Sequence, residues 1–148
     1  MRNQLVFAIT SLLCISAQAG EWKQFTPTAY TLAPAEDKKI FALANLNGDA
    51  INVNLVDVSG SSCGATETSA PSAAGPYKIN GTNVKFLQAC INGSSILSPE
   101  TQKGKAFFAK AITSGTATVE LDFGVALHFT SEDFETAKKL MLDTKQAL

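Results

Sequence analysis

One histidine is the only ordinary general base that the sequence offers. Among the 148 residues His128 is that histidine, so a hydrolase triad would have to use it to activate its nucleophile. It lies on an apolar segment, and the nearest acids along the chain, Glu132 and Asp133, fall in the expected cap of the following helix. We interpret His128 as a half-exposed strand residue, with a catalytic base as the alternative.

Two acids, Glu120 and Asp122, form a second candidate for catalysis. Residues two apart on a strand point to the same face, about 7 Å apart. Paired carboxylates can perform acid–base work on glycosides. The same spacing is typical of the solvent-facing side of an amphipathic strand, which is the interpretation we favour. A small hydrolase that uses His128 or this pair stays open as an alternative function.

The sequence predicts no metal site and no cofactor. Four residues resemble a calcium loop in composition, but they lack its acidic pattern, its glycine spacing and its closing glutamate. They are Asn45, Asn47, Asp49 and Asn52. One histidine and two bonded cysteines cannot supply a transition-metal site. The sequence contains neither a phosphate loop nor a dinucleotide fingerprint, so we expect no cofactor and assign no catalytic residue.

Two cysteines, Cys63 and Cys90, are predicted to form one disulfide. They are separated by 27 positions, whereas redox-active pairs are usually close together, as in Cys-x-x-Cys. We therefore favour a structural bond over a redox-active one. In the chain-entropy account, a closed loop of about 28 residues stabilises the fold by roughly 3.5 kcal/mol.

Residues 1–19 are predicted to be a secretory signal peptide. Arg2 precedes a short apolar run, and Ala17-Gln18-Ala19 is a small-x-small cleavage site, so we expect cleavage after Ala19. The third cysteine, Cys14, would leave with this segment. It fits a lipoprotein signal poorly, because Leu13 stands where that motif needs a small residue. No later segment is apolar for long enough to span a bilayer.

Export and charge narrow the class of protein. Two cysteines in an exported chain fit an oxidising compartment, so we expect a periplasmic or secreted bacterial protein. Without Arg2, 11 Lys+Arg face 13 Asp+Glu, and the net charge is 11 − 13 = −2. This weak charge argues against nucleic acid as a partner and against electrostatic docking on an acidic membrane.

The remaining residues 20–148 are predicted to form one α+β domain. Asn-Gly turns at residues 47–48 and 80–81 indicate two hairpins. The four strands would run over residues 38–46, 50–58, 77–79 and 82–91. A bulge is predicted at Leu55-Val56, where the alternation of apolar residues breaks. Residues 116–123 and 125–129 follow, either as two strands or as one strand bent at Gly124.

The ends of the domain are predicted to pack on this sheet. Residues 20–37 would form an arm or edge strand that places Trp22 and Phe25 on the core. Ser98 and Pro99 would open a middle helix, with a start only at Gly104 as the alternative, because that glycine weakens the first half. Ser131 would cap a C-terminal helix whose apolar stripe contains Phe134, Ala137, Leu140 and Met141. The prediction is a small antiparallel sheet built from hairpins, with the C-terminal helix and a shorter middle helix on one face.

These features favour a small binding or accessory protein. Residues 59–76 are rich in small polar residues, and we expect them to form a flexible loop that is the first candidate contact surface. The expected partner is another protein in the envelope or outside the cell, and the expected role is that of an inhibitor or immunity-type factor or an accessory role at the envelope. A structural envelope subunit, assembled through an edge strand near residues 22–30, is the third reading.

Overall fold

The computed structural model describes residues 20–36 and 39–147. The predicted signal peptide, residues 1–19, lies outside the described residues, as does Cys14. Within the described ranges, neither helix has the length and apolar character that crossing a bilayer requires.

The described residues form an α+β fold with one antiparallel sheet. Its nine strands lie in the order β1-β2-β3-β4-β7-β6-β5-β8-β9. The strands are β1 Lys23–Thr26, β2 Ala29–Leu32, β3 Ile40–Asn47, β4 Ala50–Asp57, β5 Ser72–Ile79, β6 Thr82–Ile91, β7 Ser94–Pro99, β8 Gly115–Glu120 and β9 Ala126–Ser131. The helices are α1 Gln102–Thr113 and α2 Phe134–Gln146, and a short 3-10 turn, η1, spans Asp122–Gly124. The predicted fold class is confirmed.

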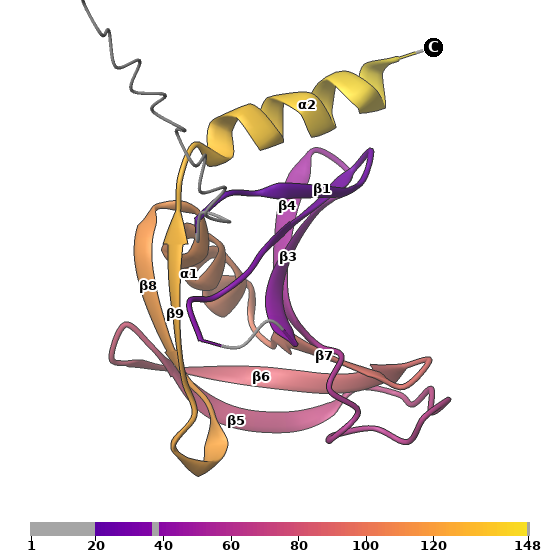
Figure 1. Ribbon diagram of the computed structural model, residues 1–148, viewed down its shortest axis with the longest axis vertical. Helices are drawn as coiled ribbons and strands as arrows, with labels where there is room; N and C mark the ends of the chain where they lie inside the picture. Colours follow the sequence, from indigo (N-terminus) through magenta and orange to yellow (C-terminus); the bar gives the residue numbers. More distant parts are fainter. Residues whose placement is uncertain (1–19, 37–38, 148) are drawn as a thin grey trace, which may run out of the picture.

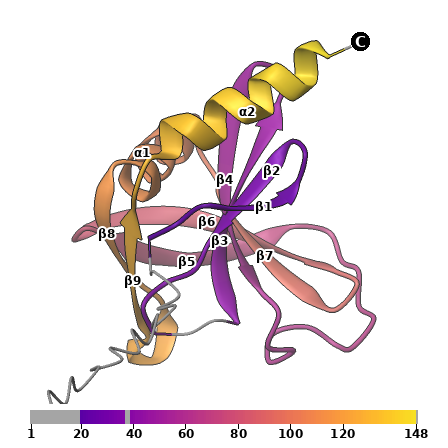
Figure 2. The same cartoon turned by 45° about the horizontal axis from the view of Figure 1, so that its top comes forward.

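The sheet bends into a deep trough. Figure 1 shows β3 and β4 on one side, β8 and β9 on the other, and β5 and β6 across the bottom. α1 lies inside the trough, where it contacts β4, β7, β8 and β9. α2 crosses the open end of the trough and contacts β3 (Figures 1 and 2).

One core fills the concave side of the sheet. The rings of Phe86 on β6 and Phe108 on α1 are fully buried, with centroids 5.4 Å apart and planes at 84°. Tyr77 on β5 extends this aromatic row, at 5.3 Å from Phe86. Met141 brings α2 into the same cluster. Both helices therefore pack on one face, as predicted.

The N-terminal arm is an edge hairpin, β1 paired with β2. Trp22 is buried against α2, with its ring centroid 4.9 Å from that of Phe134. Its Nε1 donates a hydrogen bond to Ser131 Oγ at 2.7 Å. Phe25 is 68% exposed, so the prediction that it packs on the core is wrong. β1 is the outermost strand, and all four of its residues are exposed.

The hairpin predicted around residues 47–48 is formed by β3 and β4. The bulge predicted at Leu55-Val56 is wrong, because the register of these two strands runs without a shift. Leu55 and Val56 are both buried, although they point to opposite faces. Val56 has Phe41 and Ile96 as its cross-strand neighbours, which cover it on the convex face.

β8 and β9 form a hairpin, paired from Gly115↔Ser131 to Glu120↔Ala126. The alternative of one strand bent at Gly124 is therefore wrong. The connection contains η1, where Phe123 and Gly124 both have left-handed backbone conformations, with φ 61° and 71°.

α1 begins later than the start predicted at Ser98 and Pro99 and before the alternative start at Gly104. Ser98 and Pro99 end β7, a strand that was not predicted, and the helix starts at Gln102. Its cap is Thr101, whose Oγ1 accepts a hydrogen bond from the backbone N of Gly104 at 2.9 Å. The predicted cap was wrong because pairing of Ser98 and Pro99 with β6 holds them in the sheet.

α2 also begins later than predicted. Ser131 ends β9, and the helix follows Asp133, which has φ 52°. Ser131 does not cap the helix, because it pairs with Gly115 at the end of β9 and the N-cap position is held by Asp133. Its hydroxyl accepts the hydrogen bond from Trp22. Of the predicted stripe, Phe134, Ala137 and Met141 are buried, but Leu140 is 48% exposed.

The loop predicted over residues 59–76 is shorter in the structure. β5 begins at Ser72, so residues 72–76 belong to a strand paired with β6, and the prediction is wrong for them. This part of β5 has small side chains and an irregular register between Ala74 and Tyr77, where the Gly75-Pro76 peptide bond is cis. The sequence pattern for a strand is weak there because the side chains are small. Pairing with β6 holds these residues in the sheet.

Candidate functional site

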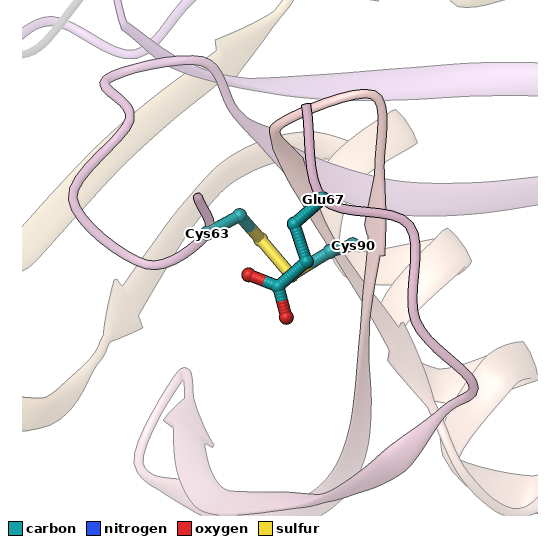
Figure 3. Close-up of side chains that lie close together, drawn as sticks. All are labelled: Cys63, Glu67 and Cys90. Carbon is teal, nitrogen blue, oxygen red and sulfur yellow. A yellow bond between two sulfur atoms is a disulfide. The ribbon is translucent and has the colours of Figure 1, made fainter. Parts of the chain in front are cut away.

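The disulfide between Cys63 and Cys90 is formed as predicted (Figure 3), with 5.9 Å between the two Cα atoms. Cys90 lies near the end of β6 on the same face as buried Val84 and Phe86. The bond therefore attaches the loop of residues 58–71 to the concave side of the sheet.

Hydrogen bonds hold the same loop at further points. Ser69 N donates to Cys90 O at 2.9 Å, and Ser69 Oγ accepts from Cys90 N at 3.2 Å. Gly93 N donates to Glu67 O at 2.9 Å. The attachment is therefore broader than the single anchor that the sequence suggested.

Glu67 lies beside the disulfide (Figure 3). Its carboxylate and the two sulfur atoms of Cys63 and Cys90 lie within 4.8 Å of one another, a grouping that could suggest a metal site. Both sulfurs are bonded to each other, however, and metals bind cysteine as the thiolate. The carboxylate instead accepts a hydrogen bond from Gly64 N at 2.8 Å, which closes a turn of the loop.

A substitution at Gly93, in the β6–β7 turn, tests how much the contact between this turn and the loop contributes to stability. A Cβ at Gly93 would lie 2.3 Å from Ala65 O, whereas a Cβ at Gly81, which has nearly the same φ, meets nothing within 4 Å. We expect Gly93→Ala to lower the free energy of unfolding by about 3 kcal/mol and Gly81→Ala by about 1 kcal/mol. Both substitutions place an alanine at a positive φ, which lowers stability, but only the Cβ of Gly93→Ala also collides with Ala65 O. Urea denaturation of the two variants measures the difference, and equal losses would contradict the contact.

A cleft of about 430 Å³ lies where this loop meets the trough. It is lined by Ile40, Asp57, Ser61, Ser62, Tyr77, Gln88, Ser95, Leu97, Leu121, Asp122, Phe123 and Val125. Among the described residues that line it, only Asp57 and Asp122 are charged, and none is basic. The cleft is thus an acidic hollow with an apolar rim.

Two pairs of polar side chains are hydrogen-bonded inside the cleft. Gln88 Nε2 donates to the hydroxyl of buried Ser95 at 3.1 Å. The Tyr77 hydroxyl donates to Asp122 Oδ2 at 3.4 Å. Burial, and after it the Asp122 carboxylate, raises the pKa of Tyr77 above its ordinary value of 10.0. The tyrosine therefore stays a neutral hydrogen-bond donor at physiological pH.

Asp122→Asn is expected to lower the pKa of Tyr77, but not to its ordinary value, because burial is the larger cause of the shift. The folded state favours the neutral phenol. Its contribution to stability is present below about pH 10 and is lost as the pH rises through the raised pKa. Absorbance titration of the phenolate measures this, with Tyr77→Phe identifying the signal against Tyr30. An unchanged pKa in Asp122→Asn would exclude the role of that charge.

Phe123 stands on the rim of the cleft, at the tip of the β8–β9 connection. Its side chain is 103% exposed, and its backbone is left-handed, with φ 61° and ψ 28°. A bulky residue in this conformation costs on the order of 1 kcal/mol. The turn therefore holds a large aromatic ring in solvent at an energetic cost.

His128 lies on β9 outside the residues that line the cleft, with 57% of its side chain exposed. Its partner is Glu36, which contacts His128 Nδ1 and accepts from His128 N at 2.8 Å. The backbone hydrogen bond is the main cause that lowers the pKa of Glu36. A half-exposed strand histidine agrees with the prediction, although the acid beside it is neither Glu132 nor Asp133.

Contrary to the prediction, Glu120 and Asp122 do not lie on one face of the same strand. Glu120 is the last residue of β8 and lies opposite Lys78 on β5. Asp122 belongs to η1 and lines the cleft. Because Asp122 lies outside β8, the strand-spacing argument for a catalytic pair is wrong.

Of the four calcium-like residues, Asn45, Asn47 and Asn52 belong to the paired strands β3 and β4, and Asp49 lies in the turn between them. Asp49 Oδ1 lies 2.5 Å from Lys145 Nζ near the end of α2. Lys145 also donates to Gly48 O at 2.9 Å. The lysine lowers the pKa of Asp49 by hydrogen bonding and charge.

A Gly-x-Ser-x-Gly pattern at residues 60–64 centres on Ser62, which lines the cleft. In nucleophile elbows this pattern occupies a sharp strand-to-helix turn. Here it lies in an irregular loop, and its fourth residue, Cys63, is in the disulfide. Because no histidine lines the cleft, Ser62 has no triad partner among the described residues that line it.

Most of the residues that line this cleft could not be predicted from the sequence. Gln88 gave a usable signal, since it is a polar residue on the same strand face as Val84, Phe86 and Cys90. No sequence pattern links Gln88 with Asp57, Tyr77 or Phe123, because these residues come from separate parts of the chain. Compared with protein-family models, with curated proteins and with solved structures, the chain matches none of them.

Proposed function

We propose that this is an exported binding protein that recognises a partner protein through the cleft and its rim. One observation carries the proposal: Phe123 is held wholly in solvent, by a left-handed backbone, at the edge of an acidic hollow. Backbone strain of this kind clusters at functional sites. Aromatic residues are also over-represented among the side chains that dominate binding energies.

The charge of the cleft indicates which side chain it accepts. Asp57 and Asp122 are the charged residues among the described lining, so the cleft suits a lysine or arginine of the partner. The exposed ring of Phe123 adds a surface on which such a cation can lie. An inhibitor or immunity-type factor in the periplasm or outside the cell is the role that this form of recognition fits.

Binding is favoured over hydrolysis by the composition of the cleft. His128, the base that a hydrolase would need, is paired with Glu36 and is absent from the lining residues. Tyr77 is protonated at physiological pH, and its raised pKa moves its deprotonation further above that range. The groups that remain are suited to hydrogen bonding and to charge recognition.

Phe123→Asn is the test. Asparagine adopts left-handed backbone more readily than phenylalanine, so we expect this variant to gain about 1 kcal/mol of stability while losing its partner. Affinity capture from the envelope fraction, quantified by mass spectrometry, measures binding, and thermal unfolding measures stability. The matched control is Phe25→Ala, which removes another exposed aromatic ring far along the sheet on β1. A partner retained equally by both variants would overturn the proposal.

A further inference from the structure

Half of β4 has an open edge. Only its last three residues, Leu55, Val56 and Asp57, pair with β7, whereas residues 50–54 pair with β3 alone. No loop or turn of the described chain makes a backbone hydrogen bond to residues 50–54. In an antiparallel ladder, alternate residues direct their N–H and C=O groups away from the paired neighbour. This segment therefore presents unpaired backbone groups, which can template a further strand.

α1 faces this open edge across a groove of about 300 Å³. Five consecutive residues, 50–54, form the strand wall. The helix wall consists of Gln102, Lys105, Ala106 and Ala109, whose spacing of three, four and seven places them on one helix face. Ser98 closes the end of the groove, where β7 no longer pairs with β4. A strand edge beside a helix face is the geometry in which extended peptides are recognised by strand addition.

We propose that this groove binds an extended, acidic segment of a partner protein, which adds to β4 as a further strand. The small side chains of Ala106 and Ala109 leave room for every second side chain of the segment. Lys105 is the only charged residue that lines the groove, and its ammonium group has no ion-pair partner among the described residues. An acidic side chain of the bound segment would supply that partner.

The charge of α1 argues against a second copy of this chain as the occupant. The helix carries three lysines, Lys103, Lys105 and Lys110, and no acidic residue. Two copies joined through their open β4 edges would bring two such helices near one another, which is unfavourable. The groove is also separate from the cleft, because no residue lines both.

Selection of short random peptides, displayed on phage, against the purified protein tests the proposal. We expect the selected peptides to be acidic, with apolar residues at alternate positions. For the best synthetic peptide, Ala106→Leu, which fills the groove, and Lys105→Glu, which reverses its charge, should each weaken binding by about tenfold or more. Lys110→Glu makes the same charge change on the same helix outside the groove and should leave binding within about twofold.

Two further measurements separate strand addition from other modes. Methylation of alternate backbone amides of the peptide should abolish binding, and bound peptide should slow hydrogen exchange in residues 50–54. Binding that survives both the methylated peptide and Lys105→Glu would overturn the proposal, even if Ala106→Leu fails to fold. Selection of basic peptides would also overturn it, as would self-association that Lys105→Glu strengthens. If Phe123→Asn abolishes peptide binding, the peptide binds in the cleft and not in this groove. That result would overturn the groove proposal without contradicting the proposed function of the cleft.

Discussion

Replacement of both Cys63 and Cys90 by alanine is expected to lower the free energy of unfolding by about 3.5 kcal/mol. The disulfide closes a loop of about 28 residues, and its loss returns that closure entropy to the unfolded chain. A domain of this size is stable by about 5–15 kcal/mol, so the loss is a large fraction of the total. The two residues are 7% and 5% exposed, and the vacated space adds to the cost.

Urea denaturation of this double variant and of the parent protein, each with and without reductant, measures the effect. Reductant should destabilise the parent protein to about the level of the variant and should leave the variant unchanged. A loss below about 1 kcal/mol would show that the hydrogen bonds of Ser69 and Glu67 hold the loop without the disulfide. Because Ser61 and Ser62 line the cleft, the variant should also bind the partner more weakly.

Phe108→Ala is expected to be the most destabilising single truncation, by about 4 kcal/mol. The Phe108 ring is fully buried and packs edge-on against Phe86, so its removal leaves a cavity between α1 and the sheet. Its chain neighbour Phe107 is the matched control. That ring is 38% exposed, so we expect Phe107→Ala to cost about 1 kcal/mol. Equal losses in urea denaturation would contradict this assignment of α1 to the core.

The local signals in the sequence were sufficient for the hairpins and for the inner face of β6. The Asn80-Gly81 turn lies between β5 and β6 as predicted, whereas the first hairpin turns one residue later than predicted, at Gly48 and Asp49, because Asn47 pairs with Ala50. The alternation of Val84, Phe86 and Cys90 predicted their burial, because a strand exposes alternate faces to different surroundings. The disulfide followed from elimination, since only two cysteines remain after residue 19.

Long-range contacts overrode the local signals at both helix starts. Ser98 and Pro99 have the composition of a helix start, but pairing with β6 makes them the end of β7. Ser131 has the composition of a cap, but Trp22, far away along the chain, donates a hydrogen bond to its hydroxyl. A cap contributes about 1 kcal/mol, which a strand ladder or a buried tryptophan exceeds.

The sequence by itself determined the two cysteines that pair, the hairpin turns and the apolar faces, because each depends on residues that are close together or on a count. Only the tertiary structure decided where a partner can bind. The cleft brings Asp57, Tyr77 and Phe123 together from separate strands and turns, and the groove exists because β7 leaves the edge of β4 after three residue pairs. The cleft and the groove follow from the bending and pairing of the whole sheet, so they cannot be predicted from any short stretch of sequence.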